Sequence, residues 1–118
     1  MNRPQKVLVV AQDTQLATTL VAWLLESGCE TALTTTYSAG RDQLDDGPAV
    51  VIAEVRLGAY NGLQLALRAR AKGIPALVLG EADLTTEREA HAVGAKYLSP
   101  LDLQKADLQS LVHAALMP

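Results

Sequence analysis

The sequence is poor in aromatic side chains and in cysteine. It contains no phenylalanine, one tryptophan and three tyrosines, and Cys29 is its only cysteine. A single cysteine cannot form an internal disulfide framework or a cysteine-rich metal site. The 118 residues are enough for one domain with one core. We predict a single domain over residues 1–118, with a core built from aliphatic side chains.

Long apolar runs and an excess of positive charge are also missing. No run approaches the roughly 18–20 apolar residues that a membrane span requires, and the polar start Met1–Lys6 has no signal-peptide core. The formal net charge is −3, so no overall basic field attracts nucleic acid or an anionic membrane. We expect a cytoplasmic domain that contacts neither a membrane nor, directly, nucleic acid.

The usual motifs of catalysis are absent as well. The chain has no glycine-rich phosphate loop, no G-x-S-x-G elbow and no H-E-x-x-H helix. His91 and His113 fall on separate predicted helices, and neither has a carboxylate or cysteine at the spacing of zinc ligands. We therefore expect no enzymatic activity, no metal site and no cofactor.

Five short apolar segments stand out in what is present. Continuous, partly β-branched runs of this length are typical of strands buried on both faces of a parallel sheet. The predicted strands begin about 19–26 residues apart, which leaves room for a helix and two loops between them. They cover residues 7–11, 30–34, 49–53, 76–79 and 96–98.

Helical spacing of apolar residues fills the gaps between these strands. The predicted helices follow Asp13 or Thr14, begin at Ser38, follow Asn61, open at a Thr86–Glu89 capping box and follow Asp102. Five alternating strand–helix units predict an α/β fold with right-handed crossovers. We predict a flavodoxin-like (βα)5 doubly wound parallel sheet with strand order 2-1-3-4-5.

This topology locates a site before any motif is considered. Ligands of open α/β sheets bind beyond the carboxyl ends of the strands, at the point where the strand order reverses. Strands 1 and 3 are neighbours there, so Glu54 should face the Gln12–Asp13 turn. Gly80–Glu81 and Ser99–Pro100 should reach the same edge.

In order and spacing, these segments resemble the response-regulator receiver domain of two-component signalling, over essentially the whole chain. Residues 6–10 resemble the family's first strand, and residues 48–57 with Asn61, Gly62 and Leu63 resemble its third strand, phosphoacceptor and following loop. Residues 74–79 resemble its fourth strand, and residues 94–100 its fifth strand and proline turn.

The positions at which the family binds Mg²⁺ and phosphate are changed. The resemblance places the family's acidic, Mg²⁺-binding pair at Ala11 and Gln12, with Asp13 adjacent, and its phosphoacceptor aspartate at Glu54. Mg²⁺ prefers near-octahedral oxygen ligands, commonly including carboxylates. We expect Mg²⁺ binding to be weak or absent. Glu54 is then either a fixed charge that imitates a phosphorylated aspartate or a solvated carboxylate at a strand end.

The positions that respond to phosphorylation in the family are changed too. The resemblance places its phosphoryl-contacting hydroxyl at Gly80 and its lysine at Ser99, although Lys96 could be a displaced equivalent. Tyr97 matches the family's strand-5 aromatic, as a switch or as a packing residue. We predict an atypical receiver domain of a signalling or transcriptional regulator, either stand-alone or part of a longer protein, that acts by protein–protein contact without phosphorylation.

Two alternatives and a partner surface complete the predictions. The first alternative is a phosphorylatable receiver that uses Asp13 and a displaced Lys96. The second is a flavodoxin-like domain for a small anionic ligand, which the carboxylates at the same edge disfavour. The resemblance implies a face for a protein partner or homodimer on the fourth helix, fifth strand and fifth helix, near Arg88, His91, Lys96, Tyr97, Lys105 and Leu108.

Overall fold

The computed structural model describes residues 6–116. Five strands within them form one parallel sheet. The sheet contains β1 (Lys6–Val10), β2 (Glu30–Thr34), β3 (Val50–Glu54), β6 (Ala76–Leu79) and β7 (Lys96–Leu98), in the order β2-β1-β3-β6-β7. A small antiparallel hairpin of β4 (Arg56–Leu57) and β5 (Tyr60–Asn61) follows β3. The hairpin strands β4 and β5 lie outside this sheet. When only the strands of the sheet are numbered, its order is the predicted 2-1-3-4-5.

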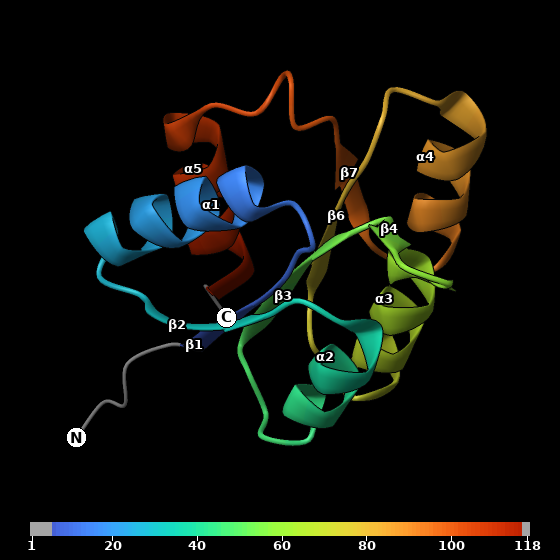
Figure 1. The fold of residues 1–118 in the computed structure, drawn as a ribbon, viewed down its shortest axis with the longest axis horizontal. Coiled ribbons are helices and arrows are strands. Elements are labelled where there is room, and N and C mark those ends of the chain that lie inside the picture. The colour runs from blue at the N-terminus through green and yellow to red at the C-terminus, as the bar shows by residue number, and fades with distance from the viewer. Residues whose placement is uncertain (1–5, 117–118) are drawn as a thin grey trace.

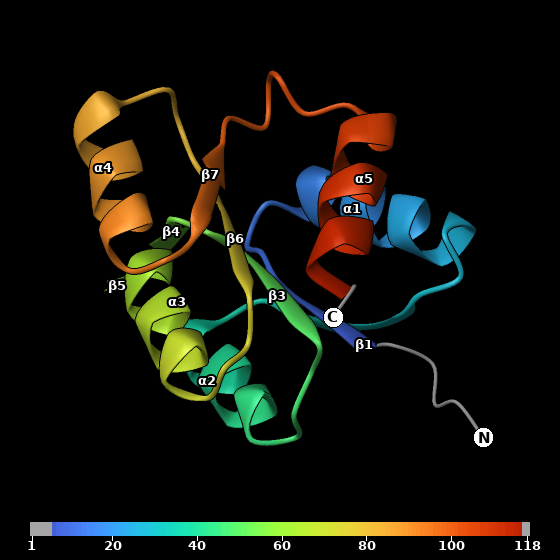
Figure 2. The ribbon, with the colours of Figure 1, turned by 180° about the vertical axis from the view of Figure 1, so that it is seen from behind.

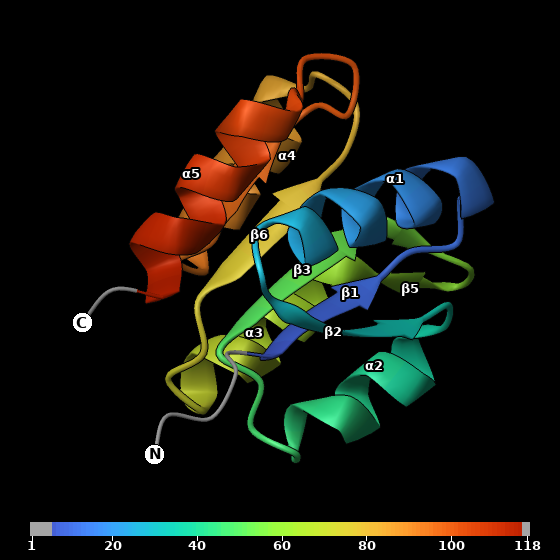
Figure 3. The same ribbon diagram turned by 90° about the vertical axis from the view of Figure 1, so that its left-hand side faces the viewer.

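Five helices cover the two faces of the sheet. They are α1 (Thr14–Glu26), α2 (Tyr37–Leu44), α3 (Gly62–Ala71), α4 (Leu84–Ala92) and α5 (Lys105–Leu116). Figure 1 and Figure 2 show α1 and α5 together on one side, and Figure 3 shows the sheet between this pair and α2 with α3. The predicted flavodoxin-like fold is confirmed. No helix within the described residues is long and apolar enough to cross a membrane.

The uninterrupted apolar runs are explained by burial of the sheet on both faces. Successive side chains of a strand point to opposite faces. Val7 and Val9 accordingly pack into the cluster beneath α1 and α5, whereas Leu8 and Val10 pack into the cluster beneath α2 and α3. All four are fully buried, so a polar side chain at any of them would lie in the core.

The start of α4 differs from the prediction. The helix begins at Leu84, and Asp83 is its N-cap: Asp83 Oδ1 accepts a hydrogen bond from the Thr85 amide at 3.1 Å. The Thr86 hydroxyl donates to Asp83 Oδ2 at 2.8 Å. The predicted Thr86–Glu89 capping box is therefore wrong, because Thr86 already lies in the first helical turn and serves the cap residue.

The start of α5 also differs. The prediction placed Asp102 as its cap, but the helix begins at Lys105. Asp102 lies in a turn, where its amide donates to the Ser99 carbonyl at 3.1 Å. The stretch between β7 and α5 is consequently a longer loop than predicted, and this loop forms one side of the site described below.

Two residues that we predicted on a partner surface belong to the packing of α5. Leu108 is fully buried in the cluster beneath α1 and α5. Lys105 Nζ lies 2.7 Å from Glu26 Oε2, so this lysine is paired with α1. The placement of Leu108 on the partner surface is wrong, because this position of α5 faces the core. Lys105 is exposed at the start of α5, and its place on that surface stays a prediction.

This placement predicts a loss of stability when Leu108 is shortened. Leu108→Ala should lower the free energy of unfolding by about 2–5 kcal/mol, because it leaves a cavity beneath α5. Leu101→Ala is the matched control: the Leu101 side chain is 96% exposed, and we expect a change within about 0.5 kcal/mol. Denaturant unfolding followed by circular dichroism measures both. Equal effects for the two variants would contradict the packing of α5 described above.

Candidate functional site

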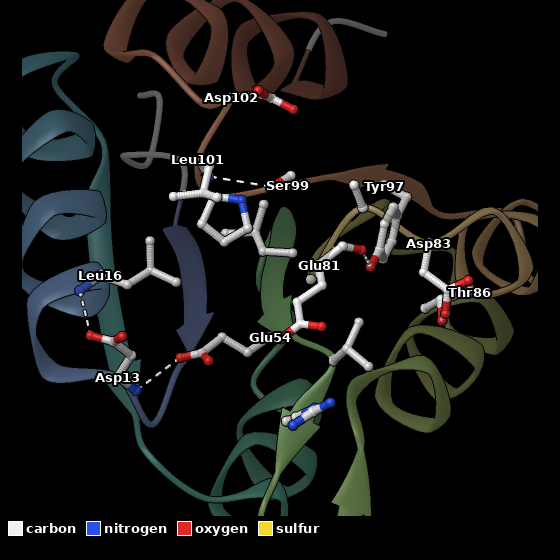
Figure 4. A pocket seen from close by; sticks show the side chains of 16 residues that line it. Asp13, Leu16, Glu54, Glu81, Asp83, Thr86, Tyr97, Ser99, Leu101 and Asp102 are labelled. Carbon is white, nitrogen blue, oxygen red and sulfur yellow. Dashed lines mark hydrogen bonds between the residues drawn. The ribbon is translucent and has the colours of Figure 1, made fainter.

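The carboxyl edge of the sheet opens into a groove of about 650 Å³. Its walls come from the turn before α1, the end of β3, the loop after β6 and the loop after β7 (Figure 4). This is the edge that the topology predicts for a site. Six charged residues line the groove, five of them acidic: Asp13, Glu54, Glu81, Asp83, Asp102 and Arg56.

Glu54 connects the end of β3 to the start of α1. Its Oε1 accepts a hydrogen bond from the Asp13 amide at 2.9 Å, and Asp13 Oδ1 in turn accepts one from the Leu16 amide at 3.0 Å as the N-cap of α1 (Figure 4). Glu54 is half-buried. It is therefore not a freely solvated carboxylate, since one of its oxygens holds the backbone of the neighbouring turn.

The residues at this edge do not fit the magnesium ion that the family resemblance implies. Ala11 is apolar and 1% exposed. The Gln12 amide nitrogen lies toward the hairpin, 3.4 Å from where a Cβ on Gly58 would stand. One oxygen of Glu54 and one of Asp13 already accept backbone hydrogen bonds. Within residues 6–116, no three His, Cys, Asp or Glu side chains are arranged to hold a metal ion.

Tyr97 lies against Gly80 on the opposite side of the groove. The Tyr97 hydroxyl donates to the Glu81 carbonyl at 2.5 Å. A Cβ on Gly80 would collide with this hydroxyl and would stand 2.7 Å from Val55 Cγ2. Because residue 80 has no side chain, the Tyr97 ring and hydroxyl can occupy this position. Burial, and secondarily the carboxylates near the β6–α4 loop, raise the pKa of Tyr97 above its ordinary value.

Ser99 and Lys96 supply no positive charge to the groove. Ser99 lines it, but its hydroxyl accepts a hydrogen bond from the Leu101 amide at 3.3 Å and closes a local turn. Lys96 is exposed at the start of β7, paired in register with Leu77, and lines a smaller cavity away from the groove. The displaced-lysine placement is therefore wrong in this structure.

The charge of the groove is unbalanced. The three ion pairs among the described residues, Arg41–Asp42, Lys72–Asp45 and Lys105–Glu26, include none of its side chains. The hydrogen bond from the Thr86 hydroxyl, helped by the Thr85 amide, lowers the pKa of Asp83 and keeps this carboxylate charged. A small anion entering the groove would meet five carboxylates and one arginine, so the geometry gives no support to an anionic ligand.

Sequence reasoning missed the tyrosine pair beside the hairpin. Tyr60 stacks on Tyr37 with a ring-centroid distance of 4.7 Å and an interplanar angle of 12°. Arg68 Nε donates to the Tyr37 hydroxyl at 2.9 Å. Tyr60 therefore lies over α2. Gly62, which directly follows the hairpin, has no room for a side chain, because a Cβ there would collide with the Glu54 carbonyl.

Comparisons of the sequence with protein-family models and with curated proteins gave no match. Solved structures, however, match almost the whole chain. A response regulator from Chloroflexus aurantiacus superimposes with a TM-score of 0.87 at 25% identity, over 97% of this chain and 98% of that one. A CheY-like receiver domain protein from Methanospirillum hungatei gives a TM-score of 0.87 at 18% identity, over 97% and 94%.

A third match is the beryllofluoride-activated NtrC4 receiver domain dimer, with a TM-score of 0.85 at 18% identity, over 95% of this chain and 96% of that one. The structural neighbours of this chain are thus response-regulator receiver domains. This finding confirms the resemblance at the level of the fold.

The contact between Gly80 and Tyr97 predicts an energetic coupling. Gly80→Ala should lower the free energy of unfolding, and the loss should be smaller in a Tyr97→Ala background, with a coupling energy of about 0.5–3 kcal/mol. Gly47→Ala is the matched control, because nothing lies within 4 Å of a Cβ there, and its cost should be the same in both backgrounds. Denaturant unfolding of the wild type, the two single variants and the double variant measures the cycle. An uncoupled Gly80→Ala would contradict the described position of Tyr97.

Proposed function

We propose that this chain is an atypical receiver domain of a two-component-type signalling or transcriptional regulator, which acts by protein–protein contact without phosphorylation and catalyses no reaction. The observation that carries the proposal is the surroundings of Glu54. Its Oε1 is held by the Asp13 amide, and the groove around it contains four further carboxylates and one arginine. The receiver fold is retained, while the groups that phosphoryl transfer needs are not.

The physical argument concerns charge. Transfer of a phosphoryl group to a carboxylate brings two sets of anionic oxygens together, and it needs a cation between them and donors on the developing charge. Gly80 offers no hydroxyl, and the Ser99 hydroxyl closes a local turn. Arg56 is the one basic residue that lines the groove, and it is exposed. The repulsion among the carboxylates therefore has little to offset it.

Resistance to phosphorylation can be measured directly. After incubation with Mg²⁺ and acetyl phosphate, the intact mass of the chain should be unchanged, because the exposed Arg56 is the one basic residue of the groove and faces five carboxylates there. The NtrC4 receiver domain, which is activated by beryllofluoride, serves as the positive control for a parallel beryllofluoride titration followed by amide NMR shifts. A stoichiometric phosphoryl adduct on Glu54 would overturn the proposed function.

The surface proposed for protein contact is narrower than the sequence predicts. With Leu108 in the core and the exposed Lys105 already paired with Glu26, we centre the surface on α4 and β7. Arg88, His91 and Lys96 are exposed there, and Tyr97 is half-buried beside them. The dimeric state of the NtrC4 receiver domain supports a protein contact for this fold. We propose that a protein partner or a second copy of this chain binds this α4–β7 surface.

Charge reversal tests the homodimeric form of this contact. Sedimentation velocity over a concentration series should show self-association, and the double variant Arg88→Glu/Lys96→Glu should weaken it by about tenfold or more, because it reverses two charges at the contact. Arg41→Glu/Lys72→Glu is the matched control, since it makes the same change in net charge on α2 and the end of α3. A wild-type chain that remains monomeric would contradict the homodimer, and equal weakening by both variants would contradict the location.

A further inference from the structure

The groove at the carboxyl edge has an apolar floor and a rim. The rim carries the six charged residues that line the groove. Leu16, Val55, Leu79 and Pro100 are among the residues that line it. Leu101 stands on its border with 96% of its side chain exposed, more than any other large apolar residue among residues 6–116. Grooves of roughly 300–1,000 Å³ accept groups of the size of a few side chains, so the volume of about 650 Å³ fits a short segment of polypeptide.

The carboxylates of the rim lack positively charged partners within the described part of the chain. Glu81 and Asp102 are exposed and their side chains take part in none of the hydrogen bonds or ion pairs of residues 6–116. Asp13 and Asp83 accept hydrogen bonds from backbone amides as the N-caps of α1 and α4. Complementary charge on a partner would therefore be attracted to this rim and would fix its register.

The combination of floor and rim selects among possible occupants. A metal ion has no set of three ligands here, and it would leave the apolar floor uncovered. Nucleic acids and small anions carry the same sign of charge as the rim. A basic peptide that also carries apolar side chains matches both parts. Its cations would meet the carboxylates, and its apolar side chains would be removed from water when they pack against Leu16, Leu79 and Leu101.

We propose that this groove binds a basic, amphipathic segment of a partner protein, with its lysine or arginine side chains at the carboxylate rim and an apolar side chain on the floor. The inference rests on the proposed function, because a groove that is not used for phosphoryl transfer is open to a polypeptide. It gives the domain a second contact surface, which borders the α4–β7 surface at Tyr97, and it states the chemistry of the partner.

A synthetic peptide probes this directly. The probe is a short fluorescein-labelled peptide of lysine and leucine at amphipathic helical spacing. Two comparison peptides replace its lysines with glutamate or its leucines with serine. Fluorescence anisotropy should show binding of the lysine–leucine peptide only, weakening as salt is raised. Amide NMR shifts should fall on residues 13, 54, 79–83, 99, 101 and 102.

Substitutions of exposed side chains test the location of the peptide-binding site without changing the stability of the fold. Glu81→Lys/Asp102→Lys should weaken peptide binding about tenfold or more, because it reverses two rim charges, and Leu101→Ser should weaken it severalfold. All three side chains are exposed, so the free energy of unfolding should be unchanged. The matched control is Glu30→Lys/Asp46→Lys, with the same change in net charge at the amino end of the sheet, and it should bind nearly as the wild type.

Several outcomes would overturn the inference. Equal weakening by the control variant, or shifts away from the groove, would show non-specific attraction to an acidic protein. Binding of the leucine-free peptide with undiminished affinity would remove the role of the floor. Shifts at the groove that grow with protein concentration alone would identify a second copy as the occupant and overturn a partner segment. A phosphoryl adduct on Glu54 would overturn the proposed function, whereas the peptide titration reports on the groove whatever the adduct experiment gives.

Discussion

Burial of the sheet on both faces is the constraint on which the rest of the structure depends. Strand β1, which lies between β2 and β3, sends Val7 and Val9 to one helical layer and Leu8 and Val10 to the other, and none of the four is exposed. Strands that are apolar on both faces cannot carry functional side chains along their length. Polar chemistry is therefore confined to the residues at which each strand ends.

At this edge, the hydrogen bond from the Asp13 amide gives the Glu54 carboxylate a structural role. It joins the end of β3 to the first turn of α1, next to the reversal of strand order. Around it, carboxylates outnumber the single arginine, and Tyr97 fills the space beside Gly80. This excess of negative charge is the feature that we propose attracts a positively charged partner.

The strands and their order could be predicted because continuous apolar runs have few other uses in a chain of this length. The approach of Glu54 to the Gln12–Asp13 turn followed from topology alone. Details that depend on tertiary contacts could not be predicted. Asp83 and Thr86 both suit a helix start, and only the path of the β6–α4 loop decides between them. The exposure of Leu101 likewise depends on a loop whose length the residue types do not reveal.

Gly80 has a consequence for how this chain could change over time. A hydroxyl-bearing residue at this position would need a Cβ where the Tyr97 hydroxyl now lies, and Val55 Cγ2 crowds the same space. A single substitution at position 80 would therefore carry a packing cost before it brought any chemical benefit. Placing a hydroxyl at position 80 would therefore require a coordinated change at Tyr97 or Val55, so no single substitution introduces it without this cost.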